Sequence, residues 1–145
     1  MPLLKGIFYL MNNIPRYTFG RKEKLKSRKK IEGLFKSGKS FSLFPLRVVY
    51  VWASDAEVLQ AGFSVSTRYF KKAVNRNRIK RLMREGYRLQ KQPLLDMLTG
   101  TDKKLGVFFI FTGNEVPDYK LVFEKMAAVI KRLQKIVSED SITNT

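Results

Sequence analysis

The sequence predicts a single α+β domain with its elements in the order αβββαβα. Its 145 residues match the usual size of one domain, and a hydrophobic content of 44% is sufficient for a core. A stretch with little charge and many β-branched and aromatic residues lies between two segments with helical periodicity. We expect the domain to cover residues 16–137, with a flexible N-terminal extension over 1–15 and a flexible tail over 138–145.

The first half of the domain is predicted to contain one helix followed by three strands. Ser27 can cap a helix that continues to about Lys36, and Gly38 ends it. Residues rich in β-branched and aromatic side chains then predict strands over 41–43, 46–52 and 58–66. The turn that follows the second strand is short, so we expect the second and third strands to form a hairpin.

The second half is predicted to contain two helices around one buried strand. Residues 72–91 form the main helix, and 93–104 form a loop region that can include a short helical turn. The following residues, 105–112, are almost continuously apolar, which is typical of a buried strand. A final amphipathic helix over 118–137 presents one apolar side, so the elements are expected to assemble as a two-layer α+β sandwich.

The composition excludes several classes of protein. The chain has no Cys and no His, so zinc–thiolate sites, disulfides and Cys or His nucleophiles are impossible. Its 12 acidic residues are dispersed and no Asp/Glu cluster suggests a two-metal site, so we predict no metal ligand in this chain. No apolar stretch approaches the roughly 20 residues of a membrane span, and we expect a cytoplasmic protein with no membrane partner.

The charge of the chain indicates a polyanionic ligand. There are 29 Lys and Arg residues against 12 acidic ones, which gives a net charge of +17. Nucleic acid is the first candidate for the ligand, and an anionic membrane surface is the second. Twenty of the basic residues lie in two segments, 16–39 and 68–91, which we expect to border one binding surface.

Most basic residues of the main helix share one face. At about 100° per residue, the polar arc opposite the apolar residues contains Arg76, Asn77, Lys80, Arg81, Arg84 and Arg88. Arg78 falls outside this arc and beside Glu85, where it can support the structure. A face that is merely solvated normally mixes charges, because like charges weaken a helix. The arc is therefore expected to contact phosphates, for which Arg is well suited.

The same helix carries a family resemblance. The run AVNRNRIKRLMRE at residues 73–85 resembles the signature of the bacterial ribonuclease P protein component. The strand GFSVS at 62–66 is similar to the strand that precedes this signature, and residues 25–41 are similar to the family's first helix and loop. The resemblance covers about residues 16–137.

The resemblance implies an RNA-binding subunit of an endonuclease. Such a protein binds ribonuclease P RNA and the single-stranded 5′ leader of precursor tRNA, while Mg²⁺ held mainly by the RNA cuts the phosphodiester. The catalytic centre of the hydrolase is then not in this chain. The implied fold is similar to the second domain of ribosomal protein S5 and contains a left-handed βαβ crossover.

Two surfaces follow from the resemblance. The arc Arg76, Asn77, Lys80, Arg81, Arg84 and Arg88 is expected to contact the catalytic RNA. A cleft between the sheet and the first helix is expected to hold the leader, with matching positions at Ile31, Phe35, Tyr50, Ser64, Ser66 and Arg68. Helical spacing alone also allows Phe35 to be a core residue, and strand alternation leaves the face of Tyr50 open. The linker before the main helix is longer than the family's, and Tyr69 or Phe70 in it can supply a stacking surface.

Three other functions compete with this hypothesis. A ribosomal or other structural RNA-binding protein of the same fold would share the basic helix. A nuclease acting alone is disfavoured by the dispersed acids and the absence of His. A membrane-surface protein is disfavoured because the core needs the apolar face of the basic helix.

Overall fold

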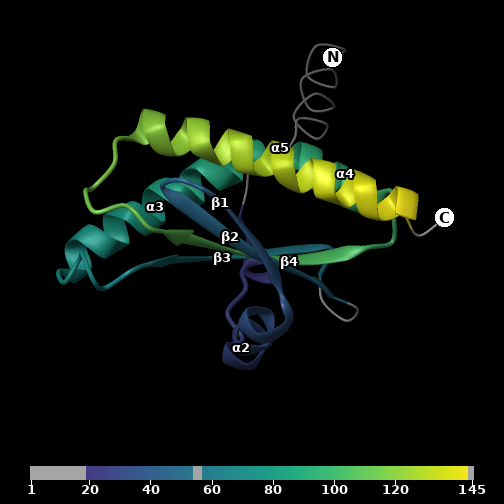
Figure 1. The fold of residues 1–145 in the computed structure, drawn as a ribbon, viewed down its shortest axis with the longest axis horizontal. Coiled ribbons are helices and arrows are strands. Elements are labelled where there is room, and N and C mark those ends of the chain that lie inside the picture. The colour runs from purple at the N-terminus through teal and green to yellow at the C-terminus, as the bar shows by residue number, and fades with distance from the viewer. Residues whose placement is uncertain (1–18, 54–56, 144–145) are drawn as a thin grey trace, which may run out of the picture.

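The computed structural model describes residues 19–53 and 57–143, which form an α+β domain (Figure 1). Its elements are a short 3-10 helix and eight longer helices and strands: η1 (Arg21–Glu23), α2 (Arg28–Ser37), β1 (Lys39–Leu43), β2 (Leu46–Ala53), β3 (Leu59–Val65), α3 (Ala73–Gln90), α4 (Gln92–Thr99), β4 (Lys104–Phe111) and α5 (Tyr119–Thr143). No helix within these two ranges is long and apolar enough to cross a membrane. The predicted extension over residues 1–15 lies outside the described residues.

The sheet has the strand order β1-β2-β4-β3. β1 pairs with β2 and β2 with β4 in antiparallel fashion, whereas β3 pairs with β4 in parallel. The predicted hairpin of the second and third strands is therefore wrong, because β4 lies between them and β1 is the hairpin partner of β2. β4 is the most apolar strand, and its central position gives it a paired strand along each edge. The parallel pair requires a crossover, which α3 and α4 provide.

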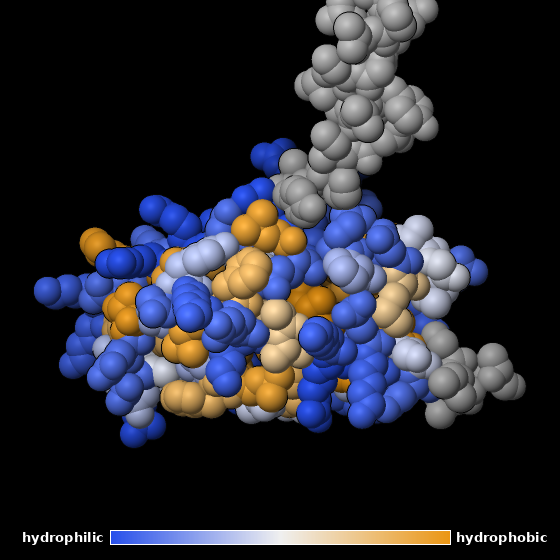
Figure 2. Space-filling view, turned by 90° about the horizontal axis from the view of Figure 1, so that it is seen from above, coloured by the Kyte–Doolittle hydropathy of each residue, from blue (hydrophilic) through white to orange (hydrophobic). Residues whose placement is uncertain are grey.

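Helices cover both faces of the sheet (Figure 1). α3, α4 and α5 form a layer on one face and enclose the main core, in which Val107 and Phe109 of β4 meet Met83 of α3 and Leu133 of α5. On the other face, α2 is the one α-helix of the described residues, and it lies over a smaller cluster. In the view onto the layer of α3–α5, hydrophilic side chains separate the hydrophobic ones (Figure 2). The predicted α+β class is confirmed.

Two helical segments extend beyond their predicted limits. The predicted loop over 93–104 contains α4, because Leu94 and Leu98 repeat at four-residue spacing and are fully buried. Pro93 is tolerated there because it lies in the first turn of the helix. α5 continues to Thr143 instead of ending near 137, and Asp140 in the added part forms an ion pair with Lys103.

Candidate nucleic-acid interface

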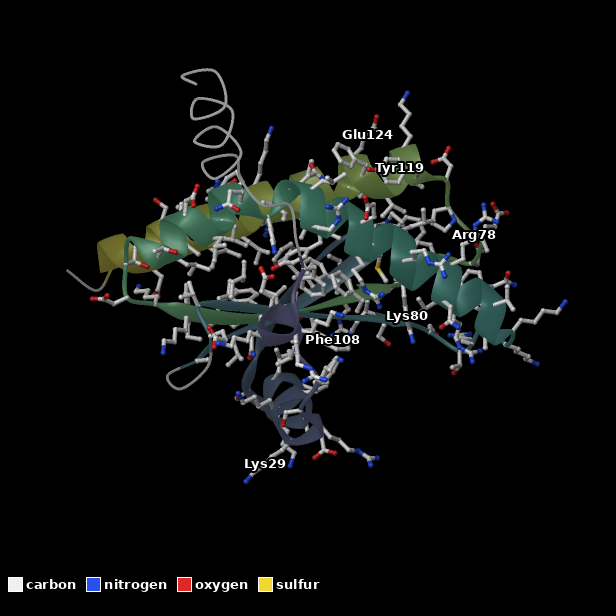
Figure 3. All side chains as sticks on the ribbon, turned by 180° about the vertical axis from the view of Figure 1, so that it is seen from behind. Lys29, Arg78, Lys80, Phe108, Tyr119 and Glu124 are labelled. Carbon is white, nitrogen blue, oxygen red and sulfur yellow. The ribbon has the colours of Figure 1, made fainter. Side chains whose placement is uncertain are left out.

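The first candidate surface is the polar face of α3. Ile79, Met83, Gly86 and Tyr87 on the opposite side are buried, which confirms the predicted amphipathic helix. Asn77, Arg81 and Arg84 are exposed and Lys80 is half-buried. Lys80 and Arg78 leave α3 on different sides, with Lys80 on the side nearer to α2 (Figure 3). Lys80, Arg81 and Arg84 form no ion pair within the described ranges, so their charges are available to a ligand.

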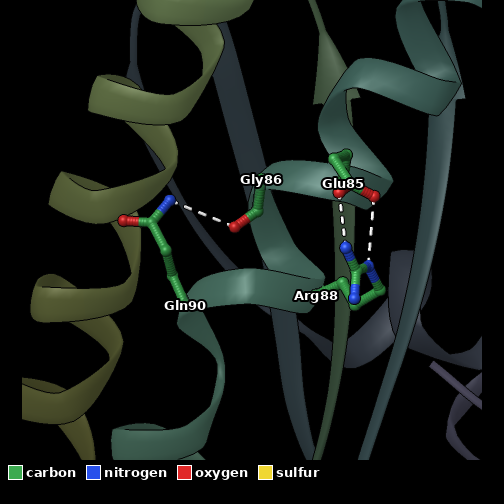
Figure 4. A network of polar contacts seen from close by, with 4 residues as sticks. All are labelled: Glu85, Gly86, Arg88 and Gln90. Atoms are coloured by element: carbon green, nitrogen blue, oxygen red, sulfur yellow. Dashed lines mark hydrogen bonds and ion pairs between the residues drawn. The ribbon is translucent and has the colours of Figure 1, made fainter. Parts of the chain in front are cut away.

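Arg88 is engaged within the protein. Its Nε donates to Glu85 Oε2 at 3.1 Å, and its Nη2 approaches Glu85 Oε1 at 2.5 Å (Figure 4). This hydrogen bond lowers the pKa of Glu85 and raises the pKa of Arg88. Arg78, which the helical projection placed beside Glu85, is exposed, and Glu85 is paired instead with Arg88, three residues further along the helix.

Further along α3 the polar side chains attach the helix to its neighbours. Gln90 donates to the carbonyl oxygen of Gly86 at 3.1 Å, as Figure 4 shows, and to that of Phe123 in α5 at 3.0 Å. Lys91, directly after the helix, is buried and paired with Glu23. The basic charge at this end of α3 therefore serves the fold, and the available cations lie nearer to its beginning.

Arg76 also has a structural role that its position in the sequence did not reveal. Its Nη1 donates to the carbonyl oxygens of Phe70 at 2.8 Å and Lys71 at 2.7 Å. These bonds tie the turn before α3 to the first turn of the helix. Arg76 and Arg84 belong to the same predicted arc, but the side chain of Arg76 is already held by backbone carbonyls.

Replacing Arg76 by Ala is therefore expected to lower the free energy of unfolding by about 1–2 kcal/mol, since two carbonyls lose a charged donor. Urea unfolding of the free protein measures this change. Arg78→Ala is the matched control, because Arg78 is exposed on the same helix, and its effect is expected to stay within about 0.5 kcal/mol. Equal unfolding curves for Arg76→Ala and wild type would contradict the structural role.

The second candidate surface lies on the α2 side of the sheet. The strand register places Val49, Phe108 and Gly62 in one row on this face, and Arg47, Ile110 and Ser64 in the next. Leu34 of α2 is buried against Val49 and Phe108, with Ile31 at the edge of the cluster. Predicted positions Ile31 and Ser64 therefore lie on the same side of the sheet.

Phe35 combines the two roles that its spacing allowed. Its ring lies 5.4 Å from the ring of Phe108 in an edge-to-face arrangement, yet 48% of the residue is exposed. Phe108, which sequence reasoning assigned only to a buried strand, supports it from the sheet. Gly62 makes room for this ring, because a Cβ there would lie 2.7 Å from two atoms of Phe108. A glycine inside a predicted strand was the available signal for such a close approach.

Tyr50 does not belong to this surface. It alternates with Val49 along β2, so it faces the core on the α5 side, where it is buried and its ring lies 6.1 Å from that of Phe41. Burial raises the pKa of Tyr50. Its predicted place in the cleft is therefore wrong. Of the other predicted positions, Ile31, Phe35 and Ser64 lie on the α2 side of the sheet, and Ser66 and Arg68 follow β3 in its connection to α3.

The hollow between α2 and the sheet has a different lining from the predicted one. It is a recess of about 390 Å³ on the other flank of α2 from Phe35, and none of the six predicted leader residues lines it. Its floor includes Leu34, Val51 and Gly106, and Lys29 and Lys30 lie at its edge. Phe35 and Ser64 are instead part of the open surface on the α2 side of the sheet, and Arg68 is exposed in the turn after β3.

The α+β fold and these basic surfaces are typical of a nucleic-acid-binding protein. A family model described as Ribonuclease P matches residues 19–134, and the chain belongs to this family. The ribonuclease P protein component of Porphyromonas gingivalis strain W83 is 35% identical over 136 residues, which span 92% of this chain and 99% of the relative. The protein component of Chlorobium phaeobacteroides is 30% identical, with 86% and 90% covered.

Solved structures agree with the family assignment. The ribonuclease P protein of Thermotoga maritima superposes with a TM-score of 0.59 at 28% identity and covers 76% of this chain and 96% of its own. The Staphylococcus aureus ribonuclease P protein gives a TM-score of 0.60 at 19% identity, with 75% and 93% covered, which supports the fold alone.

Proposed function

We propose that this chain is the protein subunit of ribonuclease P and that it binds the catalytic RNA through the polar face of α3. The observation that carries the proposal is the set of cations Lys80, Arg81 and Arg84, which have no acidic partner on the described surface and lie opposite a fully buried apolar face. Repulsion between these positive charges weakens the helix, whereas bound phosphates would neutralise the charges.

The single-stranded leader of precursor tRNA is assigned to the α2 side of the sheet. Single strands bind to surfaces that combine cations with aromatic platforms. Here Phe35 offers a half-exposed ring, Arg47 and Arg68 offer exposed cations, and Ser64 and Ser66 offer hydroxyl groups. The lysines at the recess beyond α2 extend the positive charge along the same face.

We assign the hydrolysis step to the RNA partner. The described residues contain no group of three acidic side chains that could hold a metal ion. Glu23, Glu85 and Asp140 are each paired with a Lys or Arg, so they do not form a donor set for Mg²⁺. We therefore assign Mg²⁺ to the RNA and assign no chemical step to this chain. The proposed complex works in the cytoplasm, where precursor tRNA is processed.

A cleavage assay tests this function. The protein is added to a bacterial ribonuclease P RNA at low Mg²⁺ with a precursor tRNA that carries a leader, and increased 5′ cleavage is the expected result. The same RNA without protein is the control, and protein without RNA is expected to leave the substrate intact. Binding to RNA without any stimulation would favour the alternative of a structural RNA-binding protein and would overturn the proposal.

A further inference from the structure

The turn that joins β3 to α3 holds one aromatic side chain outward and one inward. Tyr69 is 50% exposed, whereas its neighbour Phe70 is only 5% exposed. Phe70 packs in the main core with its ring 6.0 Å from that of Phe111. Of the two aromatic residues in this linker, only Tyr69 can therefore offer a ring to a ligand.

Contacts on both sides of Tyr69 fix its position. The carbonyl oxygens of Phe70 and Lys71 accept hydrogen bonds from Arg76, and the backbone N–H of Arg68 donates to Ser66 Oγ at 3.2 Å. Phe70 anchors the turn in the core. A ring presented from such a constrained turn loses little conformational freedom when it binds a ligand.

The guanidinium of Arg68 and the ring of Tyr69 together form one exposed surface. Its guanidinium carbon lies 5.4 Å from the centre of the Tyr69 ring, which is within the range of a cation–π contact. The guanidinium covers one side of the ring, yet half of the residue stays exposed. The exposed Lys71 and Lys72 follow Phe70 in the chain, so this connection carries three basic residues close to Tyr69 in the sequence.

We propose that Arg68 and Tyr69 form a stacking platform for one unpaired base of bound RNA. Planar bases stack on aromatic rings and on guanidinium planes, and nearby cations attract the phosphates that flank such a base. The pair lies in the chain between the β3 surface with Ser64 and the basic face of α3. Both the leader and an unpaired nucleotide of the catalytic RNA offer this chemistry, and the inference rests on the proposed function.

Binding measurements on Tyr69 variants test the platform. Tyr69→Leu removes the ring but keeps an apolar side chain, and about tenfold weaker binding is expected for the RNA that supplies the base. Tyr69→Phe keeps the ring and is expected to bind within about twofold of wild type. Phe44→Leu is the matched control, because Phe44 is a 70% exposed aromatic residue in the turn between β1 and β2, at the other edge of the sheet.

Separate binding measurements identify which RNA, the catalytic RNA or the leader, supplies the base. The affinity of the protein for ribonuclease P RNA alone is measured first, followed by the affinity of the assembled holoenzyme for precursor tRNA with and without a leader. A loss confined to the leader-bearing substrate assigns the base to the leader, and a loss with the catalytic RNA alone assigns it there. Unchanged affinities for Tyr69→Leu in every arm would overturn the platform, while failure of the wild-type protein to stimulate cleavage would overturn the proposed function instead.

Discussion

Replacement of Lys80, Arg81 and Arg84 by Ala in one variant is expected to weaken binding of ribonuclease P RNA by about a hundredfold or more. Each of these side chains is available for a charged hydrogen bond to phosphate, and such bonds contribute about 1 kcal/mol or more apiece. The fold should keep its stability, because Ala favours the helix and the substitutions remove repulsion between like charges. Filter binding or fluorescence anisotropy measures the affinity.

The salt dependence of binding provides a second measurement on the same variant. Loss of three phosphate contacts should make the slope of log K against log salt shallower by about 2 to 3, at about 0.7 to 0.9 per contact. The matched control removes the same charge from exposed positions of α5 by Ala substitution at Lys120, Lys131 and Lys135. An equal loss of affinity in this control would show that net charge, and not the α3 face, determines binding.

Replacement of Leu34 by Ala is expected to lower the free energy of unfolding by about 2–4 kcal/mol. Leu34 is the one buried residue of α2 and packs in the small cluster with Val49 and Phe108. Because no other α-helix of the described residues packs on this face of the sheet, loss of Leu34 should also increase hydrogen exchange of the α2 amides more than that of α3 (Figure 1). Denaturant unfolding and amide exchange measure the two effects.

Phe35→Leu serves as the comparison on the next residue of the same helix. Phe35 is half exposed, so its substitution should change stability by less than about 1 kcal/mol while reducing affinity for the leader-bearing substrate. If Leu34→Ala left stability unchanged, the small cluster would not be what holds α2. If Phe35→Leu left leader affinity unchanged, the ring would serve packing alone.

The elements that the sequence predicted well are those governed by local periodicity. The apolar face of α3, with Ile79 and Met83 buried, follows from helical spacing within a single segment. The buried strand β4 follows from an uninterrupted apolar run. The strand order could not be predicted in the same way, because the neighbours of β4 are residues more than 40 positions away in the chain.

The candidate surface on the α2 side also could not be predicted fully from local periodicity. Alternation along β2 places Tyr50 and Val49 on opposite faces, but only pairing with β4 and the packing of α2 decide which face meets the helix. The contact of Phe108 with Phe35 was not predicted, because no sequence signal shows that a buried strand residue supports an exposed ring. The hydrogen bonds of Arg76 could not be predicted from the sequence, because its acceptors are backbone carbonyls, which any sequence supplies.

The sequence by itself determined that this protein is a basic α+β domain of the ribonuclease P family, with a cationic face on its main helix. Those properties depend on composition, on local spacing and on one continuous motif. Only the tertiary structure decided which cations remain available, since Arg76, Arg88 and Lys91 are engaged within the protein while Lys80, Arg81 and Arg84 form no ion pair on its described surface. The reason is physical: a side chain's partners are set by the three-dimensional packing of residues and backbone groups that periodicity in one segment does not identify.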